Sequence, residues 1–148
     1  MANQTSSETS YELYLHQRQA HYLGKARVKL HNLTFDEEAE GCRPLNVKNV
    51  QRLAEIYESE GCRNLDPNNA VSALISDDML ANILRASGRQ QSSLIEQSIP
   101  PLLPLDEHNK LLCLNGRHRI TAGLQFLDPV ERWWLVYLYN DRNDCSMS

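Results

Sequence analysis

The chain has 148 residues, 41% of them hydrophobic, and a formal net charge of −4 at pH 7, which together fit one globular domain. Its 15 basic and 19 acidic residues disfavour binding to nucleic acid across a broad basic face, whereas a local basic pocket stays compatible with them. No apolar run approaches the roughly 20 residues that span a bilayer, and residues 1–10 lack the apolar core of a signal peptide. We therefore expect an intracellular protein, cytoplasmic or nuclear, that is not secreted and has no membrane partner.

The cysteines and histidines follow no metal-binding pattern. No two of the four cysteines stand at CxxC spacing, and His16, His21, His31 and His108 are scattered without ligand spacing. We expect reduced thiols and no metal site. The cysteines concerned are Cys42, Cys62, Cys113 and Cys145.

The composition divides the chain into three parts. Residues 1–24 are expected to form an N-terminal tail, in which 11–23 are compatible with a short helix. Residues 25–140 form the domain, and 141–148 form a polar C-terminal tail. Within the domain, residues from about 77 to 106 are interpreted as an insertion.

The first half of the domain contains two expected strands around one helix. Residues 27–30 alternate polar and apolar side chains, and 70–75 form an apolar run long enough for a buried strand. Between them a helix is expected over 47–60, with Asn46 as its N-cap and Gly61 as its stop. Its predicted apolar face comprises Val47, Val50, Leu53, Ala54 and Tyr57.

The second half alternates helices and strands again. A helix capped by Ser76 is expected over 77–86, a short helix near 93–96, and no regular structure around the prolines at 100, 101 and 104. Strands are expected over 111–114 and 133–139, on either side of a helix over 117–126. The alternation predicts an α/β (α+β) fold, with a small mixed sheet and flanking helices.

Side-chain periodicity also assigns residues to the core. Trp133 and Trp134 should point to opposite faces of their strand, so that one of them is buried. In the helices, periodicity places two further sets in the core, Met79, Leu80, Ile83 and Leu84, and Ile120, Leu124 and Leu127.

One segment has the features of an anion site. An apolar strand ends at Asn115-Gly116, and the helix that follows opens with Arg117, His118 and Arg119. Basic residues there oppose the helix dipole at about 0.3 to 1 kcal/mol each when exposed, whereas an anion is favoured by the same dipole. Glycine lets the backbone approach that anion closely. We therefore predict phosphate or nucleotide binding by residues 115–119 and Thr121; the alternative is solvated arginines and an ordinary packed histidine.

This segment resembles the signature turn of the ParB/sulfiredoxin superfamily, written loosely as G-x-[HR]-R-x-x-A. It is Gly-Arg-His-Arg-Ile-Thr-Ala at residues 116–122. Together with residues 43–45, 60–63, 65–67 and the Trp-Trp strand, it also looks like an uncharacterised family of filamentous fungi that carries a ParB-like region. The resemblance covers about three quarters of the chain, and members of that family are usually much longer.

The resemblance implies a ParB/sulfiredoxin-like fold with nucleotide phosphates seated on the turn, and a nucleoside triphosphate or diphosphate with Mg²⁺ as the ligand. Two departures count against particular activities. Arg117 stands where sulfiredoxins have the reactive cysteine, and where ParB proteins have a glutamate that assists hydrolysis. Cys113 lies inside an apolar strand, where a thiol is usually inert.

Phosphoryl transfer also needs a carboxylate to hold a metal or act as base. Candidates are Glu37 and Glu38, in an acidic loop that often faces the turn in the superfamily; the alternative is a solvated loop. Arg43 is assigned to the same phosphates, with a surface ion pair as the alternative.

Three functions remain open, and the sequence does not decide whether the domain is an enzyme. The first is a nucleotide-binding domain that performs phosphoryl transfer or nucleotide hydrolysis at the Gly116–Arg119 turn. The second is a non-catalytic accessory or regulatory fragment of a larger family. The third is a DNA-directed ParB-like nuclease, which the net charge disfavours. A protein partner is unknown from the sequence.

Overall fold

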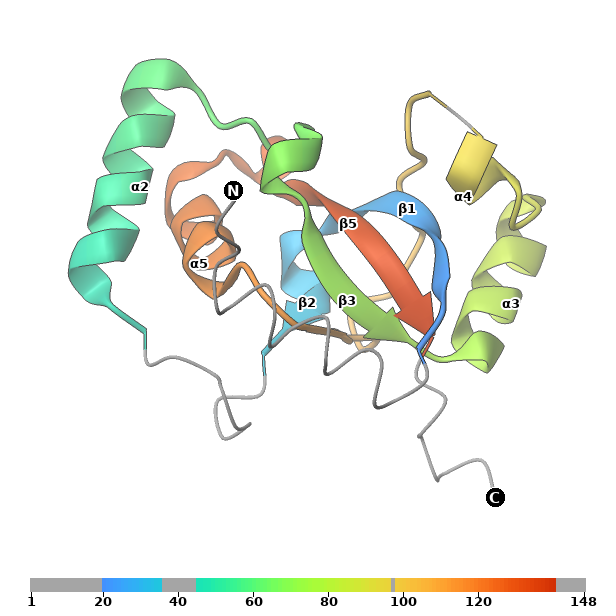
Figure 1. The fold of residues 1–148 in the computed structure, drawn as a ribbon. Helices are drawn as coiled ribbons and strands as arrows, with labels where there is room; N and C mark the ends of the chain where they lie inside the picture. Colours follow the sequence, from blue (N-terminus) through green and yellow to red (C-terminus); the bar gives the residue numbers. More distant parts are fainter. Residues whose placement is uncertain (1–19, 36–44, 97, 141–148) are drawn as a thin grey trace, which may run out of the picture.

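A five-stranded mixed sheet forms the centre of the computed structural model, which describes residues 20–35, 45–96 and 98–140 (Figure 1). The strands are β1 (Tyr22–Lys29), β2 (Leu33–Thr34), β3 (Val71–Ile75), β4 (Leu111–Cys113) and β5 (Trp133–Asn140), arranged in the order β1-β5-β3-β4-β2. The β1/β5 and β3/β4 pairs are antiparallel, whereas β5/β3 and β4/β2 are parallel. The predicted α/β class with a small mixed sheet is confirmed.

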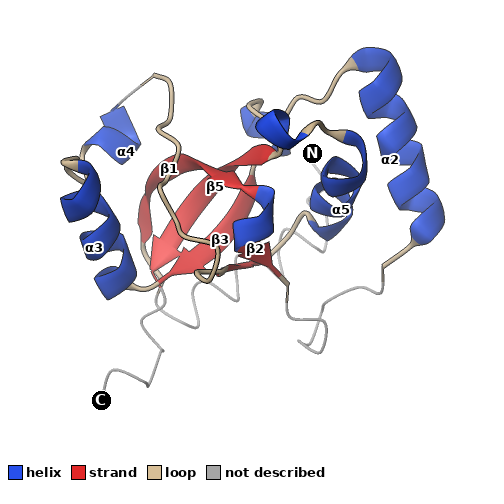
Figure 2. Cartoon of the chain, turned by 180° about the vertical axis from the view of Figure 1, so that it is seen from behind, coloured by secondary structure: helices blue, strands red, loops and turns tan. Residues whose placement is uncertain are grey.

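Helices lie on both sides of this sheet. Figures 1 and 2 show α2 (Val47–Glu60) and α5 (Arg117–Phe126) on one side, and α3 (Asp77–Ser87) and α4 (Ser93–Glu96) on the other. Three 3₁₀ turns, η1 (Leu30–Asn32), η2 (Pro67–Asn69) and η3 (Pro129–Glu131), complete the connections. Within the described ranges, no helix is long and apolar enough to cross a membrane.

Strand β5 carries much of the core because it has a strand neighbour on each side. Trp134 is 1% exposed, and Val136 and Leu138 are fully buried. Trp133 is half-buried on the opposite side, where the guanidinium carbon of Arg27 lies 5.3 Å from its ring centroid. The two tryptophans therefore differ in burial as the period of a strand predicts.

Helix α2 has the predicted bounds because its caps are local. The Asn46 side chain accepts a hydrogen bond from the backbone N–H of Asn49, and Gly61 ends the helix with φ of 91°. Val50 and Tyr57 are buried, but Val47 is 66% exposed, so its assignment to the core face is wrong. Val47 occupies the first helical position of α2.

Helices α3 and α4 also follow their sequence signals. Ser76 Oγ accepts from the backbone N–H of Met79, and Gly88, with φ of 69°, ends α3 one residue later than predicted. Leu94 of α4 is 1% exposed and packs directly on Gly24 of β1. Ile120 of α5 and Leu127, the C-cap of this helix, are buried, whereas Leu124 is 42% exposed and does not belong to their face.

Strand β1 is longer than residues 27–30 and begins at Tyr22, within the stretch predicted as a tail. Its register with β5 runs from Tyr22 opposite Tyr139 to Lys29 opposite Trp133, with an irregularity between Tyr22 and Gly24. Pairing with β5 supplies a stabilisation that the local sequence of β1 does not show. Residues 1–19 lie outside the described part of the chain.

The segment interpreted as an insertion, about 77–106, is hydrogen-bonded to the outer edge of β1. The backbone N–H of Arg27 donates to the Pro101 carbonyl at 2.8 Å, and the N–H of Leu103 donates to the Arg27 carbonyl at 2.9 Å. These bonds satisfy part of an edge that would otherwise be open to another chain. The proline-rich stretch therefore protects the sheet edge without forming a helix.

Candidate functional site

The turn between β4 and α5 is shaped by Gly116. Its φ of 83° and ψ of 17° lie in the left-handed region, which disfavours residues with a Cβ. A Cβ built there would stand 2.2 Å from Cγ1 of Val71, at the start of β3. The turn is thus pressed against β3 so closely that glycine alone fits.

Asn115 fixes the same turn to β3 by a hydrogen bond. Its Oδ1 accepts from the backbone N–H of Ser72 at 2.8 Å. One residue earlier, the N–H of Leu114 donates to the Ser72 carbonyl at 2.8 Å. Both polar groups of the Ser72 backbone are therefore used to hold the end of β4.

Arg119 lies below the turn, on the side of the core. One terminal nitrogen donates to the carbonyl of Asn69 in η2 at 2.8 Å, and the same carbonyl accepts from Nε1 of Trp134 at 2.8 Å. The guanidinium is half-buried, and desolvation lowers the pKa of Arg119 from its usual value. Arg119 thus joins α5, η2 and β5 at one backbone oxygen.

His118 joins the first turns of two helices. Its Nε2 accepts from the backbone N–H of Asn46, the N-cap of α2, at 2.9 Å. The starts of α2 and α5 therefore meet at this bond.

Helices α2 and α5 run parallel, side by side. Their starts meet at Asn46 and His118, and their far ends meet where the rings of Tyr57 and Phe126 lie 6.2 Å apart. Parallel neighbours direct the positive ends of both dipoles to the same place. That place is the β4–α5 turn.

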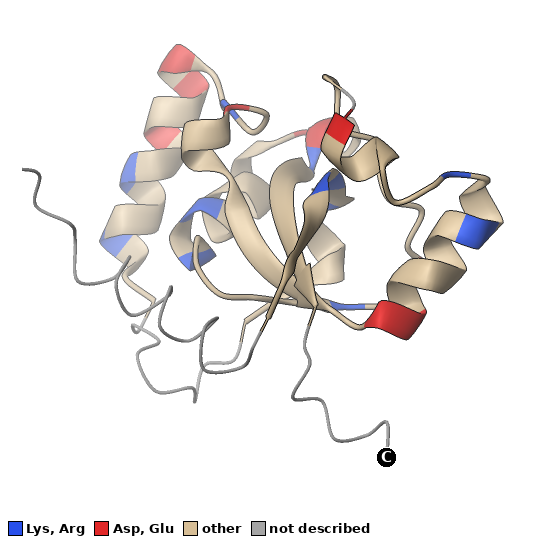
Figure 3. Cartoon of the chain, turned by 45° about the vertical axis from the view of Figure 1, so that its right-hand side comes forward, with Lys and Arg blue, Asp and Glu red and all other residues tan. Residues whose placement is uncertain are grey.

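The charges on these helices reinforce that positive end. Neither first turn contains an acidic residue, and each contains basic ones. Figure 3 shows Lys and Arg near the starts of α2 and α5, and acidic residues toward the far end of α2. The basic residues are Lys48 and Arg52 in α2 and Arg117 and Arg119 in α5; the acidic residues are Glu55, Glu58 and Glu60. This order is the reverse of the one a helix dipole favours.

The remaining predicted site residues divide into two groups. Thr121 is half-buried, and its hydroxyl donates to the Arg117 carbonyl at 2.8 Å, one helical turn back. Glu37, Glu38 and Arg43 lie outside the described residues. Sequence reasoning missed the backbone partners at Asn46 and Asn69, because a main-chain oxygen or N–H leaves no mark in the residue types.

The described cysteines are protected from ionisation. Burial raises the pKa of the Cys113 thiol far above its usual range, and burial raises that of Cys62 to about 11. Both thiols stay protonated at neutral pH, where the thiolate would be the reactive form. Over the described ranges, no three side chains of His, Cys, Asp or Glu come close enough to hold a metal ion.

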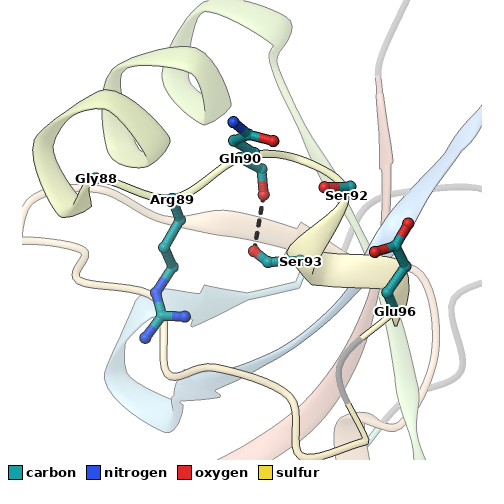
Figure 4. A pocket seen from close by; sticks show the side chains of 6 residues that line it. All are labelled: Gly88, Arg89, Gln90, Ser92, Ser93 and Glu96. Atoms are coloured by element: carbon teal, nitrogen blue, oxygen red, sulfur yellow. Dashed lines mark hydrogen bonds between the residues drawn. The ribbon is translucent and has the colours of Figure 1, made fainter.

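An open hollow lies away from the turn, between the end of α3 and α4 (Figure 4). Arg89 and Glu96 stand at its two ends, and Ser93 Oγ donates to the Gln90 carbonyl at 2.7 Å. Its lining comprises Gly88, Arg89, Gln90, Ser92, Ser93 and Glu96. None of the predicted site residues belongs to it, so the candidate site remains the β4–α5 turn.

Comparison with known proteins gives one match. The family model described as "Protein of unknown function (DUF3723) N-terminal domain" matches residues 21–148, beginning one residue before β1. No curated protein and no solved structure matches the chain. Because the family model spans most of the chain, including the whole sheet and the β4–α5 turn, the chain belongs to this family and contains its N-terminal domain.

Proposed function

We propose that this domain binds a phosphate-bearing ligand, a nucleotide in the first instance, at the starts of α2 and α5. The observation that carries the proposal is the parallel packing of the two helices, joined at their starts by the Asn46–His118 hydrogen bond. Two positive dipole ends and the basic residues of both first turns then act on the same small volume.

An anion at this place would be attracted by both helix dipoles and by the basic residues of the first turns. Each basic side chain in a first helical turn costs about 0.3 to 1 kcal/mol when exposed. A phosphate group accepts charge-assisted hydrogen bonds from arginine and from backbone N–H groups, and these bonds are about twice as strong as neutral ones. Gly116 contributes the left-handed backbone that forms the turn at the start of α5.

The nucleotide class rests on the resemblance of residues 116–122 to the ParB/sulfiredoxin turn, and the same resemblance favours a fungal source. Phosphates fit the residues present, with Arg117 and the turn backbone as the proposed contacts. A bound Mg²⁺ would need oxygen ligands from the phosphates and from carboxylates. Glu37 and Glu38 are the proposed carboxylates, for metal assistance or as a base, and Arg43 is a proposed further phosphate contact.

One observation favours a second candidate, a non-catalytic domain that keeps this fold for an accessory or regulatory role. Asn115, His118, Arg119 and Thr121 all make hydrogen bonds within the domain. Side chains committed to internal bonds serve the fold and are less available for chemistry. The first candidate binds a nucleotide at the turn and can also hydrolyse it or transfer its phosphate. The second candidate performs no chemistry on a nucleotide.

Thermal unfolding with a panel of nucleoside diphosphates, nucleoside triphosphates and inorganic pyrophosphate, each with and without Mg²⁺, tests the proposal. A ligand at 100 times its dissociation constant adds about 2.7 kcal/mol, which raises the melting temperature by about 5 to 11 °C. We expect such a shift for at least one of these anions, and we expect Arg117→Met to reduce it.

Arg89→Met is the matched control, because it removes an arginine from the other side of the sheet. It should leave the ligand-induced shift unchanged. If a nucleotide raises the melting temperature but releases no phosphate when incubated with the protein in any condition, the non-catalytic domain is favoured. No shift with any of these anions would refute phosphate binding at the turn.

A further inference from the structure

We infer that Arg119 is a positioning residue that holds the β4–α5 turn in place, and that it does not itself contact the anion. The inference rests on the proposed phosphate site and divides its residues into those that touch the ligand and those that place it. It changes the role that the sequence motif suggests for Arg119.

The turn contacts the start of β3 and the end of η2 at three points. Asn115 bonds the backbone N–H of Ser72, Gly116 packs on Val71, and Arg119 bonds the carbonyl of Asn69. As the residue number rises from 115 to 119, the number of the contacted residue falls from 72 to 69. This is expected where the end of β4 runs antiparallel to the start of β3. Residues 115–119 are therefore fitted to residues 69–72 as a unit.

The position of the guanidinium follows from Gly116. The direction of a Cβ on Gly116 points to Val71, which is fully buried, and therefore toward the core. A terminal nitrogen of Arg119 lies 3.6 Å from that same Cβ position. The guanidinium thus lies under the turn, on its core side, whereas an anion would approach the other side of the glycine.

The surroundings of Arg119 point the same way. Trp134, which is 1% exposed, shares the Asn69 carbonyl with it, and burial is the main influence on its pKa. A guanidinium that must hold a ligand would gain from solvent access, which is reduced here. Arg119 therefore acts on the ligand through the placement of Gly116 and the first helical turn.

The test compares Arg119→Met, Arg119→Lys and Arg117→Met with the unsubstituted protein, with inorganic pyrophosphate as the probe. Affinity is measured by calorimetry at low and moderate salt, well below every melting temperature. The indole N–H signal of Trp134 in nuclear magnetic resonance spectra reports on the shared carbonyl. Screening weakens contacts between charges, so removing a contacting cation should flatten the salt dependence of affinity, whereas removing a positioning residue should not.

We expect Arg119→Met to lower the melting temperature by about 4 to 8 °C without ligand, and to move the Trp134 signal. It should weaken pyrophosphate binding roughly tenfold with an unchanged salt dependence. Arg119→Lys can still donate a hydrogen bond to the Asn69 carbonyl, so it should restore most of the melting temperature and most of the pyrophosphate affinity. If Arg119→Met does not fold, the comparison is made with Arg119→Lys. Arg117→Met should flatten the salt dependence of pyrophosphate affinity.

Two outcomes would count against these ideas, and they differ. Pyrophosphate binding by the unsubstituted protein, with a flattened salt dependence and an unmoved Trp134 signal in Arg119→Met, would make Arg119 a direct contact and overturn the inference alone. Absence of pyrophosphate binding by the unsubstituted protein would overturn the proposed function together with the inference.

Discussion

The backbone N–H of Asn46 and Nε2 of His118 lie 2.9 Å apart, although the two residues are 72 positions apart in the chain. This bond connects the N-cap of α2 to the first turn of α5 and sets the two helix starts side by side. Because both partners are accessible, water can replace either of them at moderate cost. The bond is therefore suited to fixing the geometry of the site more than to stabilising the whole fold.

Replacing His118 by alanine should remove the acceptor and loosen the start of α2. We expect a loss of about 0.5 to 1.5 kcal/mol in the free energy of unfolding, measured with urea. The amide signal of Asn46 should move as its N–H turns to water. His108→Ala, which alters an exposed histidine before β4, is the control and should change neither quantity. An unmoved Asn46 amide in His118→Ala would contradict the bond.

Gly116→Ala should destabilise the protein by about 2 to 5 kcal/mol. A left-handed residue with a Cβ costs about 1 to 2 kcal/mol, and the contact with Val71 adds an overpacking penalty of about 1 to 3 kcal/mol. Gly88→Ala is a matched control, since Gly88 has φ of 69° and ψ of 23° but no atom of the described residues lies within 4 Å of a Cβ placed there.

Gly88→Ala should therefore show the backbone penalty alone. The difference between the two variants in urea unfolding isolates the contact between the turn and β3. Equal losses in both would mean that the turn moves away from Val71 at no cost, which would weaken the case for a rigid site.

Local signals in the sequence account for the parts of the fold that were predicted well. Asn46 and Gly61 bound α2, and Ser76 and Gly88 bound α3, because caps depend on residues within one turn. The glycine before α5 likewise marked the turn itself.

Long-range pairing accounts for what the sequence did not reveal. Lys25 and Gly24 interrupt the apolar pattern of β1, and only its pairing with β5 extends the strand back to Tyr22. The partner of Arg119 is a backbone carbonyl 50 positions away, and the motif gave no sign of this internal bond. The order of the strands depends on such pairings throughout, which no local pattern encodes.

Gly24→Ala should release α4 from the sheet. A Cβ at Gly24 would stand 2.4 Å from Cβ of Leu94 and 2.9 Å from its backbone carbon, so the backbone of α4 has to move. We expect a loss of about 2 to 4 kcal/mol and faster hydrogen exchange of the amides in α4.

The control for this change is Gly61→Ala, where φ is 91° and, among the residues that the structure describes, no atom lies within 4 Å of a Cβ placed there. It should lower stability by the backbone penalty and leave the exchange of α4 unaltered. Unchanged exchange in Gly24→Ala would show that α4 is held by other contacts.

The ionisation of Tyr57 should lower the free energy of unfolding of the domain at alkaline pH. Burial, followed by the charge of a neighbouring Cys62 thiolate, raises the pKa of Tyr57 from 10.0 to about 12. The folded state therefore holds this proton more tightly than the unfolded state. Its contribution is fully present below pH 10 and is lost progressively as the pH rises from about 10 to 12.

Tyr57→Phe keeps the ring between Trp134 and Phe126 but removes the ionisable hydroxyl. The difference in unfolding free energy between the unsubstituted protein and this variant should be constant up to about pH 10 and then shift in favour of the variant. Urea titrations at intervals across this range measure it. The same comparison in a Cys62→Ala background removes the contribution of the Cys62 thiol to stability. That contribution is lost between pH 9 and about 11, because burial raises the pKa of the Cys62 thiol. A difference that stays constant with pH would mean that Tyr57 ionises as readily in the folded domain as in the unfolded chain, and that the space between α2 and α5 admits water to the hydroxyl.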